Sequence, residues 1–146
     1  MLISVDHSEN AKRTVDYVAR MVGNHPEIRV TLLHVVREPG ADTVPEPSER
    51  ATRRQQLETG GRMLLEGRRA DLVSAGLSPD RVRTKLLFAV APETPADVIL
   101  REKHEGGYET IVVGRRGVSK KEEFMFGSVS SRLVREAGPQ AVWVVA

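Results

Sequence analysis

The sequence predicts a three-layer α/β domain in which a parallel sheet of five strands lies between layers of helices. Short apolar runs alternate with stretches of helical periodicity along the whole chain. The apolar runs are continuous rather than alternating, as in parallel strands that are covered on both faces. The length of 146 residues fits one domain, so residues 1–146 are expected to form a single unit.

The first part of the chain is predicted to form a strand, a helix and a second strand. Leu2 to Val5 is an apolar run, and Asp6 and Ser8 after it are favoured helix-capping residue types. An amphipathic helix follows and ends at Gly23. Ile28 to Val36 is rich in β-branched and apolar residues, which predicts a largely buried strand.

The middle of the chain is predicted to hold a loop and a long, imperfect helix. Arg37 to Ser48 contains three prolines and one glycine without any periodicity, which is typical of a surface loop. The stretch after Ser48 is predicted to be helical, although each glycine inside it costs about 1 kcal/mol relative to alanine. One apolar face of it is formed by Leu57, Leu64, Leu65, Leu72 and Val73. Gly76 and Pro79 are expected to end this helix.

The second half of the chain repeats the alternation of strand and helix. Val82 to Val90 is predicted to be a strand, and Thr94 is predicted to start the helix Pro95 to Lys103. Thr110 to Val113 is an almost wholly apolar strand. The last predicted helix and strand are Ser128 to Ala137, stopped by Gly138 and Pro139, and Ala141 to Val145.

Composition restricts the classes to which the protein can belong. The 22 Lys and Arg are set against 20 Asp and Glu, and aromatic residues make up 4%, which favours a mixed solvated surface over a nucleic-acid-binding one. The absence of cysteine excludes disulfides and thiolate metal sites. The sequence has no signal-peptide pattern and no apolar run that could cross a bilayer, so we expect a cytoplasmic protein without a membrane partner.

A glycine-rich motif follows the fourth predicted strand. The chain continues from Val113 as Gly114-Arg115-Arg116-Gly117, and nine residues later Gly127-Ser128-Val129-Ser130 opens the last predicted helix. Glycine lets the backbone approach a ligand closely, and a helix N-terminus offers free N–H groups and a positive dipole end to an anion. We therefore expect phosphate oxygens to bind here, with the hydroxyls of Ser128 and Ser130 as additional donors.

Asp6, directly after the first predicted strand, has two alternative roles. Ligands of parallel α/β sheets bind beyond the carboxyl ends of the strands, where this carboxylate could accept hydrogen bonds from two ribose hydroxyls. Asp6 could equally cap the helix that follows it. The residues alone favour neither role.

The spacing Gly114-x-x-Gly117, nine residues, Gly127-Ser128 resembles the G-2x-G-9x-G-S/T signature of the ATP-binding universal stress proteins. Four further segments resemble that family in the expected order: Val5-Asp6-x-Ser8, Leu32-Leu33-His34-Val35, Ile111-Val112-Val113-Gly114 and Val142-Trp143-Val144-Val145. The resemblance spans essentially the whole chain. It implies a Rossmann-like fold with strand order 3-2-1-4-5.

The resemblance also implies roles for individual residues. Asp6 would bind ribose, Val5 and Val35 would line the adenine pocket, and Val113 would help to close it. The residues that would surround the ribose and phosphates are Gly114, Arg115, Gly117, Gly127, Ser128, Val129 and Ser130. A Mg²⁺ ion that bridges the phosphates would rely on phosphate and water oxygens rather than on protein ligands. His7 and Val90 depart from the family pattern, which commonly has glycine at both positions.

The expected activity is binding rather than turnover, because the sequence shows no recognisable general base or nucleophile beside the motif. It contains no P-loop, no dinucleotide fingerprint and no nucleophile elbow, and its four histidines lack metal-ligand spacing. His34 is expected to be a core histidine. We expect an ATP-dependent stress-response switch that orders the 115–126 loop and is read by a protein partner.

Two alternatives remain open: an enzyme, as a weak ATPase or a kinase of its own Ser128 or Ser130, and an interaction module that binds AMP or another adenylate.

The apolar segment Ala141 to Ala146, at an expected sheet edge, predicts a homodimer through this strand, as the family resemblance also implies.

Overall fold

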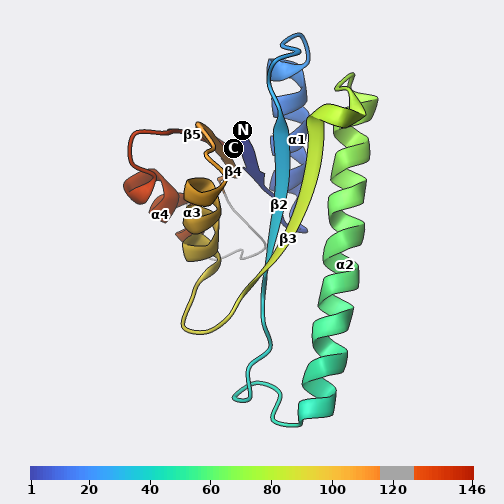
Figure 1. Cartoon of the computed structure of the whole chain (residues 1–146), viewed down its shortest axis with the longest axis vertical. Helices are drawn as coiled ribbons and strands as arrows, with labels where there is room; N and C mark the ends of the chain where they lie inside the picture. The colour runs from blue at the N-terminus through green and yellow to red at the C-terminus, as the bar shows by residue number, and fades with distance from the viewer. Residues whose placement is uncertain (116–126) are drawn as a thin grey trace.

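The computed structural model describes residues 1–115 and 127–146 and has the expected alternation of strands and helices (Figure 1). The strands are β1 (Leu2–Ser4), β2 (Val30–Arg37), β3 (Val82–Ala89), β4 (Thr110–Gly114) and β5 (Ala141–Val145). The helices are α1 (Glu9–Val22), α2 (Pro47–Ser74), α3 (Pro95–Glu105) and α4 (Ser128–Glu136), and a short 3-10 turn, η1 (Pro79–Arg81), precedes β3.

The five strands form one parallel sheet in the order β3-β2-β1-β4-β5, which confirms the predicted fold class and strand order. At its centre Ile3 of β1 is paired with Leu32 of β2 and Val112 of β4. The chain builds outward from β1 to β3 on one side and then returns to start β4 on the other. The strand order therefore reverses between β1 and β4, where ligands of open parallel sheets bind.

The helices cover both faces of the sheet and so complete three layers. Helices α1 and α2 pack on one face and α3 and α4 on the other (Figure 1). Successive strand residues point to opposite faces, so Ile3 and Leu32 belong to the core under α1 and α2, whereas Leu2 and Leu33 belong to the core under α3 and α4. These fully buried aliphatic side chains are why the strands have continuous apolar sequences.

Helix α2 begins at Pro47, within the last residues of the predicted loop Arg37 to Ser48, and so close to the predicted start of the helical stretch. Its first turns are solvent-exposed and extend beyond the end of the sheet (Figure 1), and its apolar face starts only at Leu57. Proline is well tolerated in the first turn of a helix. Arg54 anchors this part of α2, because its Nε lies 3.0 Å from Glu38 Oε1 and its guanidinium lies 4.4 Å from the ring centroid of Phe88.

The other boundaries differ from the prediction by a few residues. Strand β2 is shifted toward the C-terminus relative to the predicted Ile28 to Val36, and α3 continues past Lys103 to Glu105. Within the described residues, no helix combines the length and the apolar character that crossing a membrane would need.

Candidate functional site

The carboxyl ends of β1, β2 and β4 bring together most of the residues that the sequence singles out. Ser4 of β1 is paired with Leu33 of β2 and with Val113 of β4. Asp6, Val35 and Gly114 follow these three positions, so they reach the same edge of the sheet at the reversal of strand order. The region at the carboxyl ends of these three strands is the candidate functional site.

Ser8, not Asp6, caps α1. Ser8 Oγ accepts a hydrogen bond from the amide of Ala11 at 3.2 Å, which is the geometry of an N-cap residue. Asp6 is half-buried, and its Oδ1 accepts hydrogen bonds from the amide and the hydroxyl of Ser8, the former at 2.9 Å. Its second oxygen, Oδ2, is not used by this turn. The carboxylate is thus held in a fixed orientation at the end of β1 without being the helix cap.

The three valines assigned to the adenine pocket lie in the last layer of the core. Val5 and Val113 are each 3% exposed, and Val35 is partly buried. Val5 packs in the core under α1 and α2, whereas Val113 and Val35 pack on the opposite face. The amide of Val5 donates to the carbonyl oxygen of Leu33 at 2.9 Å and so prolongs the pairing of β1 with β2.

Gly114 lies where the end of β4 approaches α1. A Cβ atom at this position would lie 3.3 Å from Thr14 Oγ1 and 3.4 Å from Asn10 Cβ, both on α1. The first of these contacts is tighter than an ordinary van der Waals contact, so the absence of a side chain favours this close approach.

Backbone hydrogen bonds of Arg115 connect the end of β4 to the start of α4 and to β5. The amide of Arg115 donates to the carbonyl oxygen of Val145 at 2.6 Å, and its carbonyl oxygen accepts from the amide of Gly127 at 2.9 Å. The hydroxyl of Ser130 lies 3.1 Å from that same carbonyl oxygen and 3.0 Å from the carbonyl oxygen of Gly127. Residues 115 and 127, on either side of segment 116–126, are thereby joined.

The hydroxyl of Ser130 therefore faces backbone carbonyls and not an incoming ligand. Its side chain is 2% exposed, and its single O–H proton is directed at the carbonyl oxygens of Arg115 and Gly127. The expected contribution of this hydroxyl to phosphate binding stays a prediction, and it requires the O–H to turn away from these two carbonyl oxygens. Ser128, in contrast, is exposed at the first position of α4.

The first turn of α4 presents three backbone donors. The first hydrogen bond of the α-helical pattern runs from the amide of Ser131 to the carbonyl oxygen of Gly127. The amides of Ser128, Val129 and Ser130 precede it, so they have no acceptor within the helix. The positive end of the helix dipole adds to their attraction for an anion.

Part of the predicted motif lies outside the described residues. Gly117 and Arg116 fall within segment 116–126, as does most of the loop that was expected to act as a switch.

Beneath the site, His34 is the core histidine that the sequence predicts. It is 8% exposed, and its Nδ1 lies 2.8 Å from the carbonyl oxygen of Val5, so this nitrogen carries a proton. The ring of His7 stands edge-on to it, with a centroid separation of 5.5 Å. Burial lowers the pKa of His34, and the hydrogen bond to Val5 opposes that effect.

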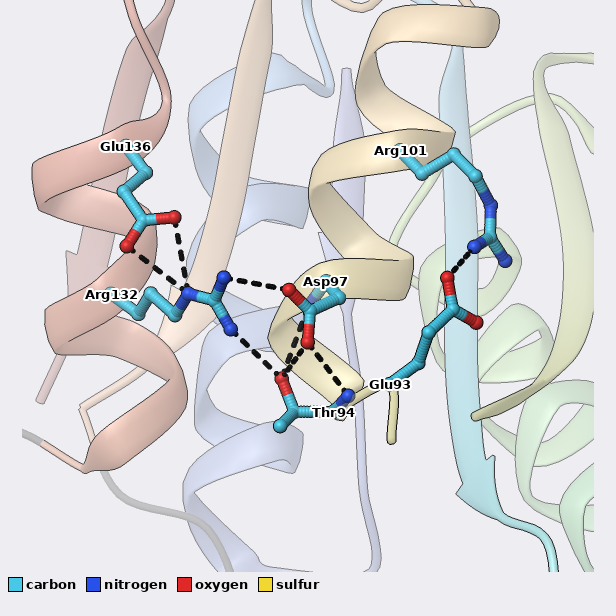
Figure 2. Close-up of polar contacts among 6 residues, drawn as sticks. All are labelled: Glu93, Thr94, Asp97, Arg101, Arg132 and Glu136. Atoms are coloured by element: carbon cyan, nitrogen blue, oxygen red, sulfur yellow. Dashed lines mark hydrogen bonds and ion pairs between the residues drawn. The ribbon is translucent and has the colours of Figure 1, made fainter. Parts of the chain in front are cut away.

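Beside the site, a cluster of polar side chains joins the first turn of α3 to α4 (Figure 2). Its members include Thr94, Asp97 and Arg132, which the sequence analysis does not assign to the site. One signal for it is readable in the sequence, because Thr94-Pro95-Ala96-Asp97 has the spacing of a capping box. The partner on α4 has no such local signal.

Comparison with known proteins agrees with the fold. The model of the universal stress protein family matches residues 1–146. The chain belongs to the universal stress protein family. The resemblance seen in the sequence is thereby confirmed at the level of the family.

Individual relatives extend over nearly the whole chain. "Universal stress protein YxiE" of Bacillus subtilis (strain 168) is 28% identical over 141 residues, which cover 91% of this chain and 89% of that protein. Universal stress protein UspA from Lactobacillus plantarum has the same fold, with a TM-score of 0.81 and 20% identity, over 99% of this chain and 95% of that one.

Two other structures with this fold contain adenine nucleotides. A universal stress protein family protein from Arabidopsis thaliana has AMP bound; it matches with a TM-score of 0.67 and 21% identity over 99% of this chain and 89% of that one. The universal stress protein from Archaeoglobus fulgidus in complex with dAMP matches with a TM-score of 0.66 and 20% identity over 99% and 95% of the two chains.

Proposed function

We propose that this protein binds an adenine nucleotide, with ATP as the preferred ligand, at the carboxyl edge of the sheet between β1 and β4. The observation that carries the proposal is the first turn of α4, whose three consecutive amides have no acceptor within the helix. The carboxylate of Asp6 follows the adjacent central strand, at a place suited to ribose hydroxyls. The family and its AMP-bound and dAMP-bound members support an adenine nucleotide as the ligand.

In this proposal the phosphates accept hydrogen bonds from the amides of Ser128, Val129 and Ser130, and the exposed hydroxyl of Ser128 adds a side-chain donor. The backbone hydrogen bond between Gly127 and Arg115 holds that turn at the end of β4, and Gly114 and Arg115 are assigned to the ribose and phosphates on their place in the motif. The base lies over Val5, Val35 and Val113. Gly117, in segment 116–126, is assigned to the phosphate side on its place in the motif alone. The described residues contain no group of three His, Asp or Glu side chains that could hold a metal, so a Mg²⁺ ion would be bound through phosphate and water oxygens.

The proposal is tested by calorimetric titration of nucleotide-free protein with ATP, ADP and AMP, with and without Mg²⁺. We expect ATP to bind most tightly and Gly127→Val to abolish binding, because a branched side chain at the helix N-cap obstructs approach to the three amides. Gly67→Ala is the matched control, since nothing lies within 4 Å of the Cβ it would add on α2. A folded, nucleotide-free protein that binds none of the three nucleotides contradicts the proposal.

We further propose that ATP acts as a switch and is turned over slowly or not at all. The proposed signal is an ordering of residues 115–126 by the phosphates, which a protein partner reads. Limited proteolysis with and without ATP tests this, and cleavage within the segment should slow when ATP is bound. An unchanged cleavage pattern contradicts the switch, and rapid release of phosphate favours the enzymatic alternative.

The proposed assembly is a homodimer that pairs through β5. The two edges of the sheet differ in chemistry: β3 carries Arg83 and Lys85, whereas β5 is formed by Ala141 to Val145 without a charge. Charged side chains on an edge strand oppose pairing with another chain, and an apolar edge favours it.

A further inference from the structure

Arg132 joins α4 to the start of α3 through two nitrogens of its guanidinium and uses the third within its own helix (Figure 2). Its Nη2 lies 2.6 Å from Asp97 Oδ1, and its Nη1 donates to Thr94 Oγ1 at 3.1 Å. Its Nε donates to both carboxylate oxygens of Glu136 on its own helix, each at 3.1 Å. The planar guanidinium is thus held by acceptors from two helices, which fixes its orientation.

The partner residues on α3 are themselves held firmly. The amide and hydroxyl of Thr94 donate to Asp97 Oδ2 at 2.7 and 2.6 Å, and the amide of Asp97 donates back to Thr94 Oγ1 at 3.3 Å. This reciprocal capping box fixes the start of α3. The hydrogen bonds from Thr94, together with Arg132, hold the pKa of Asp97 well below its usual range, so its carboxylate is ionised at neutral pH.

Arg132 lies close to the turn whose three amides have no acceptor within the helix. It follows Ser128 by four residues, about one helical turn, in a helix of only nine residues. The apolar contacts of α4 come from Leu133 and Ala137, which are buried, and from Val129 in the first turn, which is partly buried. Such contacts have no fixed direction, whereas Arg132 supplies directional contacts to α3 near the middle of α4.

Arg132 does not act as a free cation for phosphate. Its charge is balanced by the carboxylates of Asp97 and Glu136, and each guanidinium nitrogen has an acceptor. An effect of Arg132 on a ligand at the first turn would therefore pass through the position of α4.

We propose that Arg132 is a positioning residue: through Asp97 and Thr94 it holds α4 in the orientation in which the amides of its first turn bind nucleotide phosphates. This inference rests on the proposed nucleotide site. The position of α4 should affect the binding of ligands that carry phosphate. It should not affect the binding of a nucleoside without phosphate.

Two substitutions separate positioning from simple electrostatics. Asp97→Asn and Glu93→Gln each remove one negative charge near the start of α3, but Glu93 pairs with Arg101 of α3, whereas Asp97 pairs with Arg132 of α4. If only charge matters, both variants should bind ATP more tightly. If Arg132 positions α4, Asp97→Asn should bind ATP about three- to tenfold more weakly while Glu93→Gln does not.

The measurement is titration of folded wild-type, Asp97→Asn, Glu93→Gln and Arg132→Lys protein with ATP and with adenosine. We expect Asp97→Asn and Arg132→Lys to lose affinity for ATP and to keep that for adenosine. If Asp97→Asn binds ATP as tightly as the wild type or more tightly, the positioning role is overturned but the nucleotide site is not. Equal losses for ATP and adenosine overturn it too, since they indicate a general loosening. Wild-type protein that binds neither ligand overturns the nucleotide site and this inference together.

Discussion

At the scale of single residues, His34 is buried, and its Nδ1 donates a hydrogen bond to the carbonyl oxygen of Val5. Burial lowers the pKa of the imidazole. The nearby His7 lowers this pKa further, whereas the nearby Asp6 raises it. The unfolded chain, with an ordinary pKa of about 6.5 for this group, then binds a proton at pH values where the folded protein does not. The free energy of unfolding should therefore fall as the pH decreases below about 6.5, by at most about 1.4 kcal/mol per pH unit from this residue.

Chemical denaturation between about pH 5 and 7.5 measures this dependence. His34→Asn keeps a side-chain donor for Val5 but does not titrate, so its curve should be flatter than that of the wild type. His104→Asn on the exposed surface of α3 is the control and should leave the wild-type slope unchanged. Parallel curves for wild type and His34→Asn would show that another group sets the pH dependence.

Residue-level prediction from sequence reached its limit where a side chain depends on a distant partner. The sequence motif correctly indicates Gly127 and Ser128 as the start of α4, because glycine and a helix N-terminus are local features. It does not indicate that the hydroxyl of Ser130 points to Arg115, or that Arg132 contacts Thr94, 38 residues away. Such pairings follow from the packing of helices and strands, not from spacing.

At the level of whole elements, α2 shows what glycine contributes inside a helix. Gly67 is exposed and nothing lies within 4 Å of the position that its Cβ would take. Gly61 is buried, and its Cβ would lie 2.7 Å from Leu86 Cδ1 and 3.1 Å from His34 Cδ2. Gly61 therefore permits the close approach of α2 to β2 and β3, whereas Gly67 lowers helix stability without a packing role.

The two glycines predict opposite effects of the same substitution. Gly67→Ala should raise the free energy of unfolding by about 1 kcal/mol through helix propensity alone. Gly61→Ala has the same propensity gain but crowds the core, so it should be less stable than Gly67→Ala by about 1–3 kcal/mol. Thermal or denaturant unfolding of both variants measures the difference directly, and equal stabilities would contradict the close packing of α2 on the sheet.

The elements that sequence predicted well are those with a buried face. Strands such as β4 have continuous apolar sequences because both faces are covered, and α1 has a clear apolar stripe. The first turns of α2 are exposed and carry no apolar stripe, so the sequence located the start of this helix only by the end of the proline-rich loop, slightly too late in the chain. Hydrophobic periodicity reports burial, and it is silent where a helix extends into solvent.

At the scale of the whole molecule, the two edges of the sheet predict how copies of the chain associate. We expect sedimentation to give a homodimer at micromolar concentration, about twice the chain mass of 16.2 kDa. Pairing should protect amides of β5 from hydrogen exchange more than those of β3, whose edge carries Arg83 and Lys85. A monomer across this concentration range would contradict the prediction.

The backbone hydrogen bonds of Arg115 connect the proposed dimerisation with the proposed nucleotide binding. Its amide is bonded to the carbonyl oxygen of Val145 at the end of β5, and its carbonyl oxygen is bonded to Gly127 and Ser130 at the start of α4. The backbone of a single residue thus connects the proposed dimer edge with the proposed phosphate site. Coupling between two binding equilibria is reciprocal, so any factor by which nucleotide strengthens self-association is also the factor by which self-association strengthens nucleotide affinity. The measured nucleotide affinity would then depend on the concentration of the protein itself.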